Sequence, residues 1–226
     1  MTLFLFDVFG NASIGVYALV NDKIAIVPPQ VPEAKRQKVE DWLKVKVVAT
    51  TVGRSVISGV LACSNSNGVV LPSLAEEKEV RAIKSAADIN VTVIDTKKTA
   101  FGNMVLANDR GAIVGPGLER DDVSKIEDTL EVEAVTCEIA GLPYVGSLAT
   151  ATNKGVLTHP MLKDEERKVL EAVFKVPVDV GTVNCGIPYV ATGLLGNSNG
   201  AMIGSFTTGP EMFIIGQALD VVRENE

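Results

Sequence analysis

Four tight polar turns recur along this chain at nearly equal spacing. Each turn ends in a glycine and is flanked by short apolar runs, as in a β-hairpin. The glycines, 43, 44 and 45 residues apart, are Gly68, Gly111, Gly155 and Gly200. One period before Gly68, the segment Asn21-Asp22-Lys23 is again a polar turn between apolar runs. Five turns in 226 residues predict an internal repeat of about 45 residues.

Each copy of the repeat has the same order of elements. A charged segment with a helical spacing of apolar residues follows the hairpin, and a β-branched run closes the copy. In the second copy, Ser73-Leu74-Ala75-Glu76 indicates a capping box, and Val91–Ile94 is the closing run. The other closing runs are Val45–Ala49, Val132–Val135 and Val178–Val183. We expect an α/β fold in which residues 1–226 form one domain of five repeats.

The fifth copy lacks a closing run. It ends after a predicted helix that begins near Pro210 and presents Ile215, Leu219 and Val222. At the other end of the chain, the apolar run Leu3–Phe6 has no hairpin before it. The N-terminal strand is therefore expected to pair into the last repeat and close a ring, which removes the exposed edges of an open array.

The glycines of the turns have a structural explanation. Asn-Gly and Asn-x-x-Gly pairs are typical of backbone positions with positive φ. We therefore attribute these turns to hairpin geometry and not to function.

Short matches recur where each copy ends. Phe9-Gly10-Asn11 is repeated as Phe101-Gly102-Asn103, and Pro143-Tyr144-Val145 is repeated as Pro188-Tyr189-Val190. We interpret these segments, together with Gly53-Arg54-Ser55, as equivalent. A closed ring would then gather five such loops at one end.

Charge and cysteine usage narrow the functional classes. A net charge of -7 disfavours a groove that neutralises nucleic-acid phosphates, but it suits a basic protein surface. The three cysteines lack the spacing of a zinc site or of a disulfide framework, so we expect reduced, buried thiols and no metal or cofactor. The N-terminal apolar run is too short for a signal peptide, and no run approaches the roughly 20 residues of a membrane span. A cytoplasmic protein is expected.

The repeat length, the hairpins, Ala100–Asn103 and Gly181–Asn184 together resemble the translation initiation factor 6 family. The resemblance covers essentially the whole chain and is to the short, archaeal-type form without a C-terminal extension. It implies the pentein fold, a five-bladed α/β propeller with pseudo-five-fold symmetry.

The resemblance also implies a function without bond chemistry. The family docks on the large ribosomal subunit at its subunit-joining face and sterically prevents premature association with the small subunit, and a role in large-subunit maturation stays open. The implied site lies beside the sarcin-ricin loop, mostly on ribosomal proteins with limited RNA contact. The implied protein is a cytoplasmic monomer that binds neither membranes nor free nucleic acid.

Within the family, the loop asparagine that matches Asn103 lies on the ribosome-facing surface. Its neighbours and the loops interpreted as equivalent extend this prediction. The full set of predicted ribosome-binding residues is Phe101, Gly102, Asn103, Asn11, Arg54, Tyr144 and Val190. Without the resemblance, Phe101-Gly102-Asn103 would be interpreted as a turn at the end of a strand.

Two alternatives remain. Some pentein proteins are guanidino-group hydrolases with a Cys nucleophile, a His and carboxylates at the ring centre. Here Cys63, Cys137 and Cys185 have no neighbouring histidine, although proximity to His159 in space is open. The regular spacing also leaves no insertion for a substrate pocket, so we expect no enzyme. A ring that only scaffolds other proteins is the second alternative, which sequence does not separate from ribosome docking.

Overall fold

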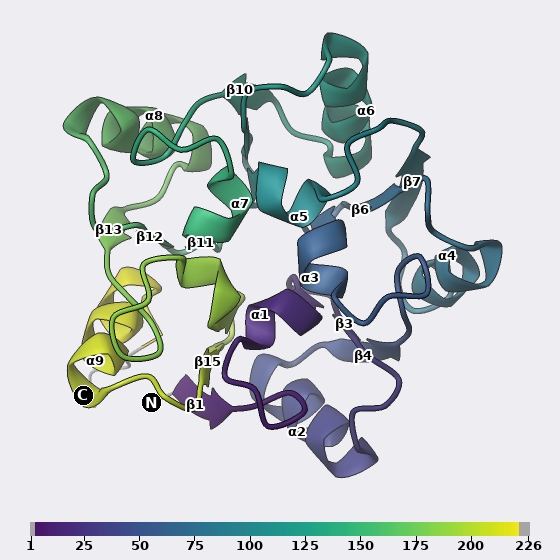
Figure 1. Cartoon of the computed structure of the whole chain (residues 1–226), viewed down its shortest axis with the longest axis horizontal. Helices are drawn as coiled ribbons and strands as arrows, with labels where there is room; N and C mark the ends of the chain where they lie inside the picture. Colours follow the sequence, from purple (N-terminus) through teal and green to yellow (C-terminus); the bar gives the residue numbers. More distant parts are fainter. Residues whose placement is uncertain (1–2, 222–226) are drawn as a thin grey trace.

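The computed structural model describes residues 3–221 as a mixed α/β fold. In this range the strands form five three-stranded sheets, each made of a hairpin and one further strand. Figure 1 shows the sheets around a common centre, with the longer helices outside them. The sheets are β2 (Leu19–Val20), β3 (Ile24–Val27) and β4 (Lys46–Ala49); β5 (Cys63–Ser64), β6 (Gly68–Pro72) and β7 (Asn90–Ile94); β8 (Val105–Ala107), β9 (Ala112–Val114) and β10 (Ala134–Thr136); β11 (Ala149–Ala151), β12 (Val156–Thr158) and β13 (Val178–Val180); and β14 (Leu194–Gly196), β15 (Ala201–Gly204) and β1 (Leu3–Phe6). We number the repeats one to five in this order.

All five sheets have the same pairing pattern. The middle strand is antiparallel to the hairpin strand before it and parallel to the third strand. A parallel third strand needs a crossover connection, which a helix supplies in repeats one to four. The predicted order of strand, turn, strand, helix and strand is confirmed.

The sheet of repeat five is completed by the N-terminal strand. β1 is parallel to β15, with Leu3 opposite Ala201 and Phe6 opposite Gly204. The edge of β15 that faces away from β14 is therefore paired. This pairing confirms the prediction that the N-terminal strand joins the last repeat.

The longer helices lie outside the sheets in Figure 1. They are α2 (Glu33–Leu43), α4 (Glu77–Lys84), α6 (Arg120–Leu130), α8 (Asp164–Phe174) and α9 (Gly209–Ala218). The capping box predicted at Ser73–Glu76 is wrong, because α4 begins at Glu77 and Glu79 accepts the Glu76 N–H at 2.8 Å. In the last repeat, Ile215 and Leu219 are buried as predicted, and Val222 lies outside the described residues.

The core is divided into apolar clusters that join adjoining repeats. One cluster combines Val27 of repeat one with Met202 of repeat five, and another combines Val70 of repeat two with Ile126 of repeat three. The helices α6 and α9 contact the sheet of the preceding repeat. Each such helix buries its apolar face between two sheets, so neighbouring repeats depend on each other for their stability.

Short helices of one turn surround the centre, as Figure 1 shows for α1, α3, α5 and α7. Each follows a third strand and contacts the next around the centre. They are α1 (Ile14–Tyr17), α3 (Ser58–Leu61), α5 (Phe101–Met104), α7 (Val145–Leu148) and the 3-10 helix η1 (Val190–Thr192). The sequence interpretation did not anticipate these helices, since one turn is too short to show a helical period.

Glycine lets these short helices approach each other by their backbones. A Cβ on Gly59 would overlap the carbonyl oxygen of Gly15, and a Cβ on Gly102 would overlap that of Gly59. The same relation holds for Gly146 against Gly102. Repeat five has Ala191 at this position, and its short helix is of the 3-10 type. The centre is thus built by backbone contact between successive repeats.

Asparagine side chains join the hairpin turns of neighbouring repeats. The Asn65 Oδ1 accepts the Asn67 and Gly68 N–H groups at 3.0 and 3.1 Å, which shapes its own turn. Its Nδ2 donates to the carbonyl oxygens of Asn108 and Leu130, at 3.1 and 2.8 Å, in repeat three. The residues with the same role are Asn21, Asn108 and Asn197. We call the end of the molecule that carries these turns the hairpin end. It is formed by residues 21–23, 65–67, 108–111, 152–155 and 197–200.

The hairpin turns contain glycine for a different reason from the predicted one. Gly68, Gly111 and Gly155 do not have positive φ, so that explanation is wrong. A Cβ on Gly155 would overlap the carbonyl oxygen of Ala218 at the end of α9. A Cβ on Gly68 would likewise overlap the carbonyl oxygen of Thr129 in α6. Glycine is needed because the helix of the next repeat ends against the turn.

Candidate docking surface

The segments that follow the middle and third strands meet at one end, opposite the hairpin end. These two strands are parallel in every sheet, so their carboxyl ends lie at the same edge. We call this the loop end. It is formed by residues 7–13, 28–32, 50–57, 73–76, 95–100, 115–119, 137–144, 159–163, 181–189 and 205–208.

Four of the five third strands lead into a tight turn. The turns are closed by isolated bridges between Val8 and Asn11, Val52 and Ser55, Ile139 and Leu142, and Val183 and Ile187. After β7, residues 95–100 form no such bridge in the described structure. Repeat three therefore differs from the others just before the predicted Asn103.

The predicted equivalence of Phe9-Gly10-Asn11 and Phe101-Gly102-Asn103 is wrong. The first tripeptide lies in the turn after β1, and the second is in the short helix α5. The helix of repeat one that corresponds to α5 is α1, so Asn103 corresponds to Val16 and not to Asn11. The tripeptides match in letters but belong to different elements. Tyr144 and Tyr189, in contrast, both immediately precede a short central helix, as their repeated motif predicts.

The predicted docking residues differ in how exposed they are to solvent. Asn11, Arg54 and Tyr144 are exposed, and Asn103 and Gly102 are half-buried. Phe101 and Val190 are both 0% exposed and belong to the core around the short helices. Direct side-chain contact by these two residues is disfavoured by their burial, and docking by the remaining five stays a prediction.

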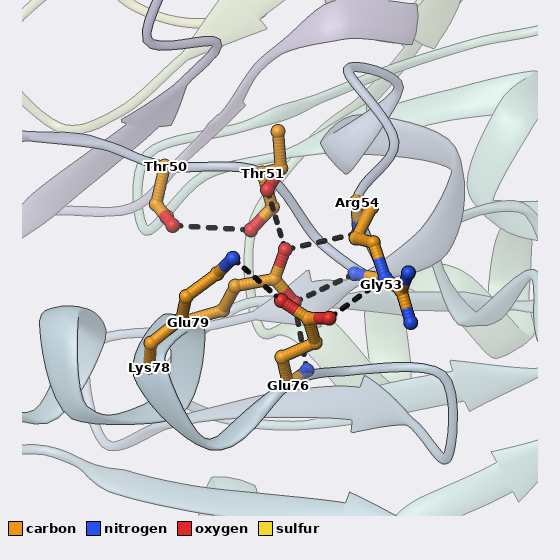
Figure 2. Close-up of polar contacts among 7 residues, drawn as sticks. All are labelled: Thr50, Thr51, Gly53, Arg54, Glu76, Lys78 and Glu79. Carbon is orange, nitrogen blue, oxygen red and sulfur yellow. Dashed lines mark hydrogen bonds and ion pairs between the residues drawn. The ribbon is translucent and has the colours of Figure 1, made fainter.

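One carboxylate holds the turn of repeat two, as Figure 2 shows. Glu79 of α4 accepts the N–H groups of Gly53 at 2.8 Å and Arg54 at 3.0 Å, and it also accepts the Thr51 hydroxyl. Gly53 and Arg54 both have positive φ, which turns their N–H groups toward the same acceptor. Burial by itself would raise the pKa of Glu79, but these hydrogen bonds and the one from the Glu76 N–H hold it below its ordinary value.

Repeats four and five contain the same arrangement. Glu166 accepts the Ala140 and Gly141 N–H groups at 2.8 and 3.0 Å. Glu211 accepts the Cys185 and Gly186 N–H groups at 3.1 and 2.8 Å. Burial opposes ionisation of Glu211, yet hydrogen bonds, led by the Thr208 N–H and the Thr182 hydroxyl, lower its pKa to about 2. We call Glu79, Glu166 and Glu211 the clamp glutamates.

Repeats one and three depart from this arrangement. In repeat one, Lys35 occupies the helix position of the clamp glutamates, and Asp7 instead accepts the Gly10 N–H at 2.9 Å and the Lys35 Nζ at 2.7 Å. In repeat three the position is held by Asp122, which is buried and lies 3.9 Å from Lys125. The sequence contained a signal for the clamps, because Thr208-x-x-Glu211 is a capping box.

Exposed large apolar side chains gather at the loop end, and sequence reasoning missed most of them. Phe206 is 69% exposed and Met161 is 75% exposed, and both lie in strand-to-helix loops. The others at this end are Phe9, Leu74, Tyr144, Ile187 and Tyr189. Exposed aromatic and apolar groups of this size are typical of surfaces that bind another macromolecule.

The three cysteines differ in burial: Cys63 is buried as predicted, but Cys137 is half-buried and Cys185 is exposed, so the prediction of buried cysteines is wrong for these two. Cys63 is buried, and burial raises the pKa of its thiol to about 12. Burial and the nearby Glu166 raise the pKa of Cys137. His159 is buried, which lowers its pKa, and its Nδ1 accepts the Met161 N–H at 3.1 Å. Among the described residues no group of three or more His, Cys, Asp or Glu could hold a metal ion, and no described helix has the length and apolarity to cross a membrane.

Comparison with protein families decides the ancestry of the chain. The model of the eIF-6 family matches residues 4–218. The chain belongs to the eIF-6 family. The resemblance inferred from the hairpins and from Ala100–Asn103 is therefore confirmed.

Curated relatives agree over almost their full length. A translation initiation factor 6 of Pyrobaculum aerophilum is 42% identical over 212 residues, covering 94% of this chain and 96% of that protein. Proteins of the same name from Methanocaldococcus jannaschii and Staphylothermus marinus are 40% and 37% identical, covering 98% and 97% of this chain and 100% and 98% of theirs.

Solved structures give a weaker likeness. DDAH from Pseudomonas aeruginosa, a mutant complexed with citrulline, has a TM-score of 0.46 at 11% identity, covering 74% of this chain and 68% of that one. The N-terminal domain of the cyanobacterial arginine dihydrolase ArgZ has a TM-score of 0.46 at 14% identity, covering 72% and 68%. At these values neither likeness bears on the chemistry of this member of the eIF-6 family.

Proposed function

We propose that this protein acts in translation initiation by docking its loop end on the large ribosomal subunit, which sterically prevents premature association with the small subunit. Membership of the eIF-6 family, whose curated relatives are named translation initiation factor 6, is the observation that carries the proposal. The protein would act in the cytoplasm as a monomer.

We also propose that residues 1–226 form a single pentein domain, a closed five-bladed propeller. Two observations support closure: β1 pairs with β15, and the short central helices contact one another in a cycle from α1 through η1 and back. In such a ring every loop-end segment faces the same way. A rigid ring presents a broad surface that blocks a partner by occupancy alone.

The loop end suits a protein surface better than bare RNA. The chain has a net charge of -7, and an acidic protein gains little binding free energy from contact with the phosphate backbone of RNA. Basic ribosomal proteins offer complementary charge. The exposed side chains of Phe9, Tyr144, Tyr189 and Phe206 supply the aromatic groups that are enriched in protein interfaces.

The guanidino-hydrolase alternative is less well supported. The small cavity at the centre, about 100 Å³, is lined mostly by glycines, alanines and aliphatic residues, and none of its described lining residues is His, Asp or Glu. Cys63 lines it, but a thiol with a pKa of about 12 supplies almost no thiolate at neutral pH. A Cys nucleophile also needs a base within hydrogen-bond reach.

Sucrose-gradient sedimentation tests the proposed function. Purified protein should co-migrate with purified large subunits and should reduce the amount of joined ribosomes when small subunits are added. Migration only with the free protein, or undiminished subunit joining, would overturn the proposal.

A substitution at Asn103 tests the docking end. Asn103 is half-buried in α5, which directly follows the loop-end segment 95–100, so Asn103→Arg adds a long charged side chain beside that end. We expect about tenfold weaker binding to the large subunit, with an unchanged melting temperature. Gln37→Arg, an exposed position on the outer helix α2, is the matched control and should bind normally. Equal binding by both variants would place docking elsewhere.

A further inference from the structure

A groove lies at the loop end between repeat five and the first turn of the chain. It has a volume of about 540 Å³, within the range of ligand-sized sites. Phe9 and Ile187 line it together with Phe206 of the strand-to-helix loop, and all three side chains are exposed. Asn11, Asn184 and Thr192 supply neutral polar groups. The groove therefore combines exposed apolar side chains with a comparable share of neutral polar groups, a mixture that protein interfaces contain.

Among the residues that the structure describes, none of those lining the groove is charged. Its lining comes from two segments, residues 8–21 and residues 180–210, and neither segment contains Lys, Arg, His, Asp or Glu. In a chain with 22% charged residues, an uncharged run of this length is unusual. A phosphate group would find no cation here, whereas depletion of charge is characteristic of protein-protein contact.

Hydrogen bonds fix the walls of the groove before any partner binds. Glu211 holds the turn that precedes Ile187 through the Cys185 and Gly186 N–H groups. Asp7 holds the opposite turn through the Gly10 N–H at 2.9 Å.

The two walls are also tied to each other. The Asn184 Nδ2 donates to the Ala12 carbonyl oxygen at 3.0 Å, which joins the two turns. The Asn184 N–H donates to the Thr207 Oγ1 at 3.1 Å, which joins its turn to the loop that carries Phe206. A pre-formed groove binds with a smaller entropic cost than one that must be ordered.

We propose that this groove seats an apolar side chain carried by a basic protein segment of the large subunit, and that Phe206 is its main contact. The proposal rests on the proposed function and names the chemistry of the partner at one part of the docking surface. An apolar side chain fills the uncharged groove, and the basic segment around it complements a chain of net charge -7. Ribosomal RNA would be expected instead at positions with exposed cations, such as Lys97 and Lys98 in the segment after β7.

Binding measurements with a matched pair of variants test the groove. Phe206→Ala should weaken co-sedimentation with purified large subunits about tenfold, because a central aromatic contact is lost. Phe213→Ala removes a similarly exposed aromatic ring from α9, outside the groove, and should bind as the unaltered protein does. Melting temperatures of both variants report folding. Equal binding by the two variants would overturn the proposal.

Photo-crosslinking identifies the occupant. A photoreactive phenylalanine analogue in place of Phe206 is irradiated with purified large subunits, after sedimentation has shown that this variant still binds. An adduct with a basic ribosomal protein, resistant to ribonuclease and sensitive to protease, supports the proposal. An adduct with ribosomal RNA, or no adduct in a complex that sediments normally, overturns it while leaving docking itself intact. Loss of sedimentation by the unaltered protein would instead refute the proposed function.

Discussion

The hairpin end and the loop end both use side chains to hold turns, but the chemistry differs. At the hairpin end, neutral asparagine amides such as Asn65 shape their own turn and also bond to the next repeat. At the loop end, the clamp glutamates bond to a turn of their own repeat. The hairpin end therefore holds the repeats together. The loop end can vary from repeat to repeat because each clamp glutamate holds only the turn of its own repeat, and the segment 95–100 is one such variation.

The largest expected effect comes from crowding the hairpin end. Gly155→Ala adds a Cβ that would overlap the Ala218 carbonyl oxygen, so the C-terminal end of α9 must move. We expect a loss of about 3 kcal/mol in the free energy of unfolding, measured by urea denaturation. Gly209→Ala is the matched control, because a Cβ there meets nothing within 4 Å. Similar losses for both variants would contradict the role given to helix approach at the turn.

A clamp glutamate should give a smaller, pH-dependent effect. Glu211→Gln removes the ionised acceptor of the Cys185 turn, and we expect a loss of about 2 kcal/mol in unfolding free energy at pH 7. The folded pKa of Glu211 is lowered from 4.5 to about 2, so its contribution is complete above pH 4.5 and is lost as the pH falls toward 2. Denaturation at several pH values should show the unaltered protein and the variant converging in that window. A constant difference between them would contradict the clamp.

The smallest effect is expected from Arg54. Its Nε lies 2.7 Å from the Glu76 Oε1, but its side chain is 80% exposed. Because exposed ion pairs contribute little, Arg54→Ala should change the free energy of unfolding by less than about 0.5 kcal/mol. The same variant should weaken co-sedimentation with the large subunit if Arg54 is a docking residue. A large loss of stability would mean that this side chain, and not Glu79, holds the turn.

Much of the fold follows from the sequence because its signal is periodic. The turn glycines, the β-branched closing runs and the unpaired strand Leu3–Phe6 together predict the order of strands and the pairing of β1 with the last repeat. The short central helices were missed, since their defining feature is a glycine that meets a carbonyl of another repeat. Such a contact, like Gly102 against Gly59, has no local signature in sequence.

The candidate site was less predictable. The shared tripeptide aligned Asn11 with Asn103, but the two residues lie in different elements. Asn11 lies in a bridged turn and Asn103 in the helix α5, because residues 95–100 form no such bridge. The exposure of Phe206 and the burial of Val190 depend on how neighbouring repeats cover each other, which local composition does not encode. The uncharged run of residues 180–210 was the one visible sign of the groove.

The pairing of β1 with β15 has a consequence for how the chain folds. The last sheet forms only when Leu3 pairs with Ala201, and four complete repeats separate these two residues in the sequence. Contacts of such long sequence separation form slowly, since the loop must be closed before the strands pair. During synthesis the first strand therefore stays without its partner until residue 201 has emerged. A circular permutant that joins β1 directly after α9 should fold faster, because it makes this closure local.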